Sequence, residues 1–158
     1  MNIFLNKKKF YLFILFYSLF AIFFALYVEY VLGYKACKLC LYQRIPYIIA
    51  IFISFIGYNY LKNNKLLILI VIIFSISTLV SGYHYGIENN VFEEFSGCAN
   101  DSLEIVDKTE LLKSLNKNIS NCKDASFKLF GISLAGINLL FSLLIVIYSL
   151  RILFYEKN

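Results

Sequence analysis

Long apolar runs alternate with shorter polar segments along the chain. Runs free of charged residues cover 10–28, 45–61, 66–87 and 129–150. Each is close to the ~20 residues that an α-helix needs to cross the hydrocarbon core of a bilayer. The runs are continuous and do not alternate between apolar and polar positions, which argues against a membrane β-barrel. The pattern therefore predicts an all-α, polytopic membrane protein, with 1–158 forming one membrane domain built as a four-helix transmembrane bundle.

The composition supports a membrane location. Hydrophobic residues make up 60% of the chain and charged residues 16%, which is too apolar for a soluble domain of 158 residues. The first run follows the lysines at 7–9 and resembles a signal peptide. It is long for the apolar region of such a peptide, however, and Val28-Glu29-Tyr30 is unlike a small-residue cleavage site. We therefore interpret 10–28 as a retained first span.

The charged residues predict the orientation, because lysine and arginine accumulate in the cytoplasmic flanks of membrane helices. With four spans, one side of the membrane receives Lys7, Lys8, Lys9, Lys62, Lys65, Arg151 and Lys157. We predict that this side is cytoplasmic, that both termini lie there, and that the outer loops 29–44 and 88–128 face the periplasm of a bacterial inner membrane. The loop 88–128 is acidic overall, whereas 29–44 is basic and fits less well. The net charge of +5 mostly reflects this orientation, and we expect no nucleic-acid partner.

All four cysteines fall in the two outer loops. Cys37 and Cys40 form a C-x-x-C in the first loop, and Cys98 and Cys122 lie in the second. Disulfides persist outside the cytosol, where an even number of cysteines indicates a disulfide framework or a redox relay. The sequence leaves three pairings open.

The C-x-x-C is the stronger redox signal. Cys40 should lie near the start of the second span, where the helix dipole favours a thiolate. Arg44 follows one helical turn later, and its positive charge would act in the same direction. The alternatives are a passive disulfide or a zinc site. Zinc would need further ligands, and His84 is the single histidine of the chain; four thiolates remain possible, but no second C-x-x-C supports them, so we expect no metal.

The segment between Cys98 and Cys122 has its own pattern. Asp107-Lys108-Thr109-Glu110 resembles a capping box, and apolar residues then recur at helical spacing as far as Ile119. This predicts a short amphipathic helix along the membrane surface in the second outer loop. Taken alone, the cysteine pair fits a structural disulfide as well as a place where an external protein thiol attacks.

Three polar residues lie near the ends of the spans. Arg44 could snorkel to lipid head groups or donate hydrogen bonds to a carbonyl oxygen of a ligand. His84 could be an interfacial histidine, a proton donor or a ligand contact. Asn138 follows the small residues at 131–136, and we interpret both features as helix-packing devices, with Asn138 placed to bond across the bundle.

Taken together, the motifs resemble the DsbB family of disulfide bond formation proteins. The resemblance depends on four spans, C-x-x-C-x-x-x-Arg at the start of the second, and Tyr-His-x-Gly-x-Glu ending the third. It also includes the second cysteine pair in the long outer loop and the Phe-Gly-Ile-Ser-Leu-Ala-Gly-Ile-Asn sequence of 130–138. These motifs occur in order and cover nearly the whole chain.

The resemblance implies a quinone-linked thiol oxidase that reoxidises a DsbA-like, thioredoxin-fold periplasmic protein. It implies that the partner's thiolate attacks Cys98, that Cys122 is the leaving sulfur, and that the electrons pass to the C-x-x-C. Cys37 would exchange with the loop pair, and Cys40 would meet the quinone. Arg44 and His84 would contact the quinone, which could be ubiquinone or menaquinone. The alternatives are a relative with a narrower set of partners, similar to vitamin K epoxide reductase-like proteins, and a non-enzymatic scaffold with two static disulfides.

Overall fold

Four long helices dominate the structure, a computed structural model that describes residues 3–61, 64–93, 122, 127–129 and 131–157. The helices are α1 (Ile3–Tyr30), α2 (Lys38–Asn59), α3 (Asn64–Glu88) and α5 (Leu134–Lys157). Each is long and apolar enough to cross a membrane, which confirms the predicted four-helix transmembrane fold. The amphipathic helix expected within 107–119 lies outside the described residues.

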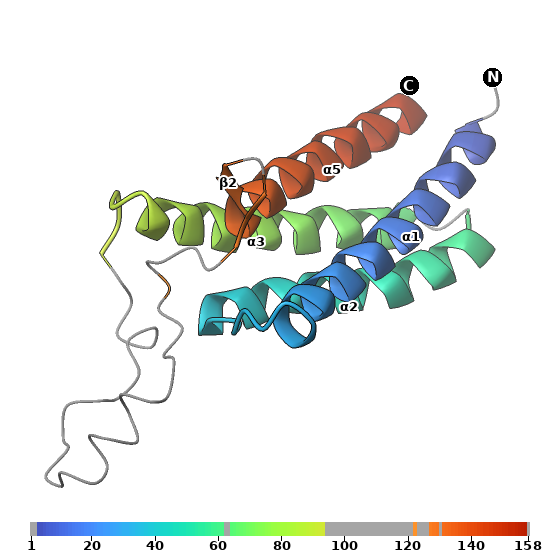
Figure 1. Cartoon of the computed structure of the whole chain (residues 1–158). Helices are drawn as coiled ribbons and strands as arrows, with labels where there is room; N and C mark the ends of the chain where they lie inside the picture. The colour runs from blue at the N-terminus through green and yellow to red at the C-terminus, as the bar shows by residue number, and fades with distance from the viewer. Residues whose placement is uncertain (1–2, 62–63, 94–121, 123–126, 130, 158) are drawn as a thin grey trace, which may run out of the picture.

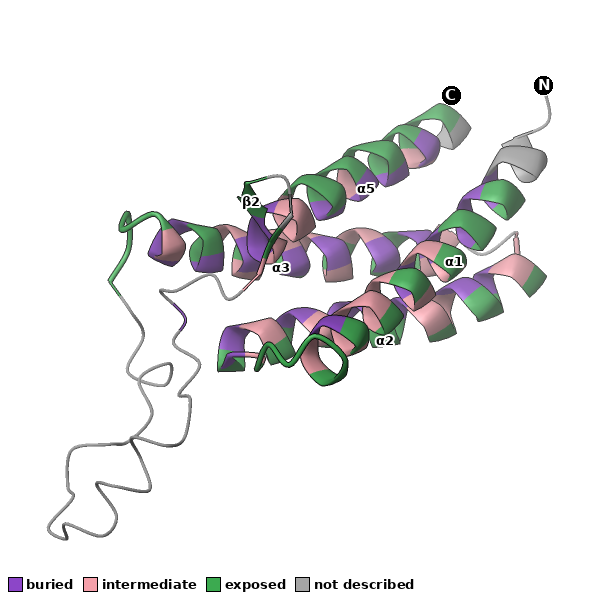
Figure 2. Cartoon of the chain, viewed as in Figure 1, coloured by how far each residue is buried: buried purple, intermediate pink, exposed green. Residues whose placement is uncertain are grey.

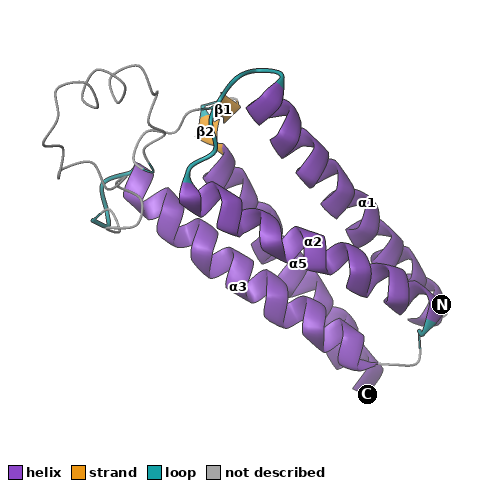
Figure 3. Cartoon of the chain, turned by 90° about the horizontal axis from the view of Figure 1, so that it is seen from below, coloured by secondary structure: helices purple, strands orange, loops and turns teal. Residues whose placement is uncertain are grey.

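The helices pack in sequence, α1 on α2, α2 on α3 and α3 on α5 (Figure 1). The two termini and the α2–α3 connection lie at one end of the bundle, whereas the α1–α2 connection and a small hairpin lie at the other (Figure 3). The antiparallel hairpin pairs β1 (Lys128–Leu129) with β2 (Ile132–Ser133), an element that the sequence did not predict. Gly131 makes the turn possible with a φ of 83°, which favours glycine.

The bundle buries a cluster of apolar side chains and also carries apolar side chains on its exterior. Tyr11, Ile14, Leu67 and Phe74 are fully buried between the helices. The outward faces also carry large hydrophobic side chains, the exposed residues of Figure 2, and this suits a surface that contacts lipid tails. The exposed set on the first two helices includes Leu12, Phe13, Phe16, Phe20, Phe23, Ile48, Phe52 and Phe55.

Small residues bring the helices close together. A Cβ on Gly57 of α2 would lie 2.5 Å from Cε1 of Tyr11, so glycine is what allows α1 to approach there. A Cβ on Gly136 of α5 would lie 2.9 Å from Cε2 of Tyr85 in α3. The small residues at the start of the fourth span therefore act in packing, as the sequence indicated.

The second helix begins earlier than its apolar run. The run starts at Ile45, but α2 starts at Lys38, so Cys40, Gln43 and Arg44 are already helical. Hydropathy reports which residues suit hydrocarbon, whereas a helix continues into the interface wherever its backbone hydrogen bonds are made. This extension places the C-x-x-C in the first turn of a membrane helix.

Candidate functional site

The C-x-x-C forms the N-terminal cap of α2. Cys37 is the capping residue, with extended backbone angles (φ −72°, ψ 168°), and its Sγ accepts a hydrogen bond from the Cys40 amide at 3.2 Å. Both cysteines are free thiols, and their Sγ atoms lie 2.7 Å apart. Because an S–S bond is ~2.05 Å long, little movement separates this contact from a disulfide.

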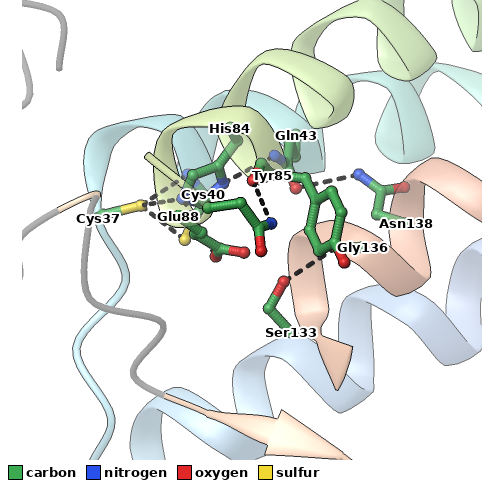
Figure 4. Close-up of polar contacts among 10 residues, drawn as sticks. Cys37, Cys40, Gln43, His84, Tyr85, Glu88, Ser133, Gly136 and Asn138 are labelled. Carbon is green, nitrogen blue, oxygen red and sulfur yellow. Dashed lines mark hydrogen bonds and ion pairs between the residues drawn. The ribbon is translucent and has the colours of Figure 1, made fainter. Parts of the chain in front are cut away.

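The histidine of α3 faces this pair (Figure 4). The Nε2 atom of His84 lies 3.6 Å from Cys37 Sγ and 3.7 Å from Oε1 of Glu88, one helical turn further along α3. Both His84 and Glu88 are almost entirely buried. His84 is thus a contact of the reactive sulfur and not a surface anchor. The sequence analysis included Glu88 only as the last residue of the Tyr-His-x-Gly-x-Glu motif and gave it no role, although its i+4 spacing from the histidine was a usable signal.

Cys37 is the acidic thiol of the pair. The hydrogen bond from Cys40 has the largest effect and lowers the pKa of Cys37 to about 5, against the opposing effect of burial. A hydrogen bond from His84 and one from the Cys40 amide lower this pKa further. The sequence argument favoured a thiolate on Cys40. The structure directs these donors to Cys37 instead, because the helix begins at Lys38 and its capping atom is the first sulfur.

Arg44 makes an ion pair that the sequence did not foresee. Its NH1 atom lies 2.6 Å from Oε2 of Glu29 at the end of α1, with both side chains about four-fifths buried. The guanidinium is therefore held near the end of the bundle opposite the two termini, one turn beyond Cys40 (Figure 3). Its positive charge is shared with a carboxylate, and it is not among the groups that lower the pKa of Cys37.

A row of uncharged polar side chains continues from His84 into the bundle. Gln43 Nε2 lies 2.9 Å from His84 Nδ1, and Asn138 Nδ2 donates to Gln43 Oε1 at 3.1 Å. The Tyr47 hydroxyl donates in turn to Asn138 Oδ1. Asn138 thus bonds across the bundle, which confirms that part of the sequence prediction. Gln43 and Tyr47 were missed, since neither belongs to a motif and only the rotation of α2 shows which of its side chains face inward.

Cys122 is brought to the same place from the second outer loop. It is disulfide-bonded and buried, and it packs in one cluster with Cys37, Leu39 and Ile87. Its backbone also lies within hydrogen-bonding reach of His84. The structure therefore gathers three of the four predicted cysteines, together with the histidine, at the end of the bundle opposite the two termini (Figure 3). Cys98 lies outside the described residues.

The same atoms have the spacing of a partial metal site. One ligand atom each from Cys37, Cys40 and His84 lies within 4.8 Å of the others. A closed structural zinc site uses four such ligands, and both cysteines would have to bind the metal as thiolates. Two thiols beside a histidine fit an exchangeable dithiol at least as well as they fit a metal site. The expectation that the protein binds no metal stays a prediction.

Two adjacent thiols, one of them acidic, at one end of a four-span bundle define a membrane thiol–disulfide oxidoreductase. Comparison with known proteins agrees with this class. Residues 7–152 match the family model for disulfide bond formation protein DsbB, and the chain belongs to that family. It is thus an inner-membrane oxidoreductase that forms disulfide bonds, as the motifs suggested.

One relative among the curated proteins is an uncharacterized protein, RP370, of Rickettsia prowazekii (strain Madrid E). It is 32% identical over 136 residues, which cover 82% of this chain and 78% of the relative. No solved structure matches the chain significantly. The similarity to RP370 covers most of both chains. Because that relative is uncharacterized, the similarity indicates no activity.

Proposed function

We propose that this protein reoxidises a DsbA-like, thioredoxin-fold periplasmic dithiol and passes the electrons to a membrane quinone. The observation that carries the proposal is the position of the two free thiols, 2.7 Å apart in the first turn of a membrane-spanning helix, with Cys122 packed beside them. A water-soluble protein and a lipid-soluble oxidant cannot easily meet at one sulfur. With two cysteine pairs at the membrane edge, one pair can react with the water-soluble protein and the other with the lipid-soluble oxidant.

The first exchange takes place at the loop pair. In our proposal Cys98 and Cys122 share a disulfide, and the partner's thiolate attacks Cys98 Sγ. The S–S bond breaks, Cys122 leaves as a thiolate, and the mixed disulfide is resolved by the partner's second thiol. The partner is then oxidised, and the loop pair holds two electrons and two protons.

The second exchange passes the electrons inward. In our proposal a thiolate of the loop pair attacks the Cys37 sulfur of a Cys37–Cys40 disulfide. The packing of Cys122 in one buried cluster with Cys37 supports this step. Cys40 then leaves, the loop disulfide re-forms, and the C-x-x-C becomes a dithiol.

The surroundings of Cys40 suit a lipid-soluble oxidant. Cys40 is partly exposed, and the neighbouring side chains of Leu41, Tyr42 and Ile45 present an apolar surface. Arg44 lies one turn away with guanidinium N–H donors that can bond a carbonyl oxygen. A bound quinone would supply a two-electron, two-proton acceptor, and Cys40 and Arg44 are the residues that would contact it.

Closing the C-x-x-C uses the acidity of Cys37. One S–S bond would form between the Cys37 thiolate and Cys40 Sγ, and a bound quinone would take up the two electrons that this oxidation releases. The proton of Cys40 and the one lost earlier by Cys37 balance the two protons that the quinone would take up. His84 holds its Nε2 atom 3.6 Å from Cys37 Sγ. The proposal also places both termini in the cytoplasm and all four cysteines on the periplasmic side.

The direct test is turnover. The purified full chain is mixed with a reduced thioredoxin-fold protein and either ubiquinone or menaquinone, and the quinone absorbance is followed. We expect consumption of at least one quinone, matched by partner disulfide, and loss of turnover in Cys40→Ser. No turnover with either quinone, together with cysteines that stay uniformly oxidised in cells lacking quinone, would identify a static scaffold instead.

A further inference from the structure

The polar row behind His84 has a definite direction. Asn138 Nδ2 donates to Gln43 Oε1, and Gln43 Nε2 faces His84 Nδ1 (Figure 4). The Tyr47 hydroxyl in turn donates to Asn138 Oδ1. Each amide has one end that only donates and one that only accepts. Once Asn138 presents its NH₂ to Gln43, the Gln43 amide must turn its own NH₂ toward the histidine.

This direction determines where the histidine carries its proton. An NH₂ group cannot accept a hydrogen bond, so Nδ1 of His84 must be the acceptor and is bare. The single proton of the neutral ring then belongs on Nε2. That atom faces Cys37 Sγ at 3.6 Å and Oε1 of Glu88 at 3.7 Å, and both are acceptors when ionised.

Burial makes the arrangement difficult to reverse. Gln43 and His84 are only 7% and 3% exposed, so an unsatisfied amide or ring nitrogen would find little water. Moving the proton to Nδ1 would require both amides to turn over together. The titratable groups that face the ring, Cys37 and Glu88, lie on the Nε2 side, and Cys40 stands behind Cys37.

We propose that Gln43 and Asn138 are positioning residues that keep Nδ1 of His84 bare, so that the ring directs its Nε2–H at Cys37. The histidine is thereby a hydrogen-bond donor to the thiolate and not a base that removes its proton. Gln43 acts on His84 directly, and Asn138 acts through Gln43 by fixing which end of its amide faces the ring. The inference deepens the proposed function, on which the catalytic importance of Cys37 rests.

The tautomer can be read directly because the chain contains one histidine. The full chain, labelled with [¹⁵N]histidine and reduced, is studied by NMR at neutral pH, where bare and protonated ring nitrogens give well-separated ¹⁵N signals. We expect a bare Nδ1 and a protonated Nε2. Gln43→Glu keeps the shape of the side chain but replaces the NH₂ by an acceptor, so the Nδ1 signal should move to the protonated range.

Matched variants separate positioning from general damage. Asn138→Leu releases the Gln43 amide, and the Nδ1 signal should shift part of the way toward the protonated range. Asn59→Asp makes the same amide-to-carboxylate change on the same helix, at an exposed residue that bonds its own backbone, and should leave the signal unchanged. A protonated Nδ1 in the unaltered protein overturns the inference even if every variant fails to fold. A bare Nδ1 in folded Gln43→Glu does so as well.

The quinone assay on the same preparation keeps the two proposals distinguishable. The NMR measurement uses neither quinone nor protein partner. A bare Nδ1 without turnover refutes the proposed function and supports the tautomer assignment, whereas turnover with a protonated Nδ1 refutes the tautomer assignment alone.

Discussion

The acidity of Cys37 can be tested on the reduced protein without any substrate. Its pKa is lowered from 9.0 to about 5, which corresponds to a preference for the thiolate on the order of 5 kcal/mol. The hydrogen bond from Cys40 is the largest cause. A hydrogen bond to a charged group contributes about 1.5–3 kcal/mol, so Cys40→Ala should raise the pKa of Cys37 to roughly 6–7.

The assay is the alkylation rate of Cys37 as a function of pH, since the thiolate reacts and the thiol does not. Peptide mass spectrometry after a short exposure to iodoacetamide separates Cys37 from the other cysteines. The unaltered protein should reach half of its maximal rate near pH 5, because the thiolate is lost as the pH falls through the lowered pKa. Asn59→Leu, at the other end of α2, should not move this midpoint.

Two results would refute the reasoning. A midpoint near the 9.0 of an ordinary thiol in the unaltered protein would show that the cap and the histidine do not stabilise a thiolate. A midpoint that stays near pH 5 in Cys40→Ala would show that the thiolate is stabilised by something other than its neighbouring S–H. His84→Leu should then be examined as the next largest favourable contact.

Three further predictions concern the quinone, the partner and the packing. Arg44→Ala should raise the apparent Michaelis constant for quinone about tenfold, the equivalent of one charge-assisted hydrogen bond, while stopped-flow exchange with the partner dithiol stays unchanged; unaltered quinone kinetics would contradict its role. Cys122→Ala should accumulate a mixed disulfide with a thioredoxin-fold protein, visible on non-reducing gels, and trapping at the C-x-x-C alone would show that the electron path is wrong. Gly57→Ala should lower stability by about 1–3 kcal/mol in thermal unfolding, since its Cβ would meet the ring of Tyr11, whereas Gly82→Ala, whose Cβ has ordinary 3.5 Å contacts, should be nearly neutral.

The sequence predicts the four spans well because hydropathy measures transfer into hydrocarbon, and that transfer governs where membrane helices form. It does not predict where α2 begins. Residues 38–44 are too polar to extend the apolar run, yet the Cys37 cap allows the helix to include them. Which sulfur receives the helix amide depends on this single boundary. In the structure it is Cys37, whereas the sequence argument favoured Cys40.

The polar partners of the site depend on geometry that no motif contains. Gln43, Tyr47 and Asn138 become neighbours only when α2 and α5 take particular rotations about their own axes. The Arg44–Glu29 pair likewise depends on how far α1 reaches past its apolar run. The cysteines and the histidine could be identified in advance, because thiol chemistry and compartment restrict their use before any packing is known.

In the proposed electron path, the burial of Cys122 beside Cys37 has a kinetic consequence. Two sulfurs held together within one chain react at a rate that does not depend on protein concentration, because folding supplies their effective concentration. The rate of encounter with an external dithiol, by contrast, falls in proportion to the concentration of either protein. At low partner concentration the delivery of electrons from outside should therefore limit the overall rate, and the internal transfer should remain fast at every dilution.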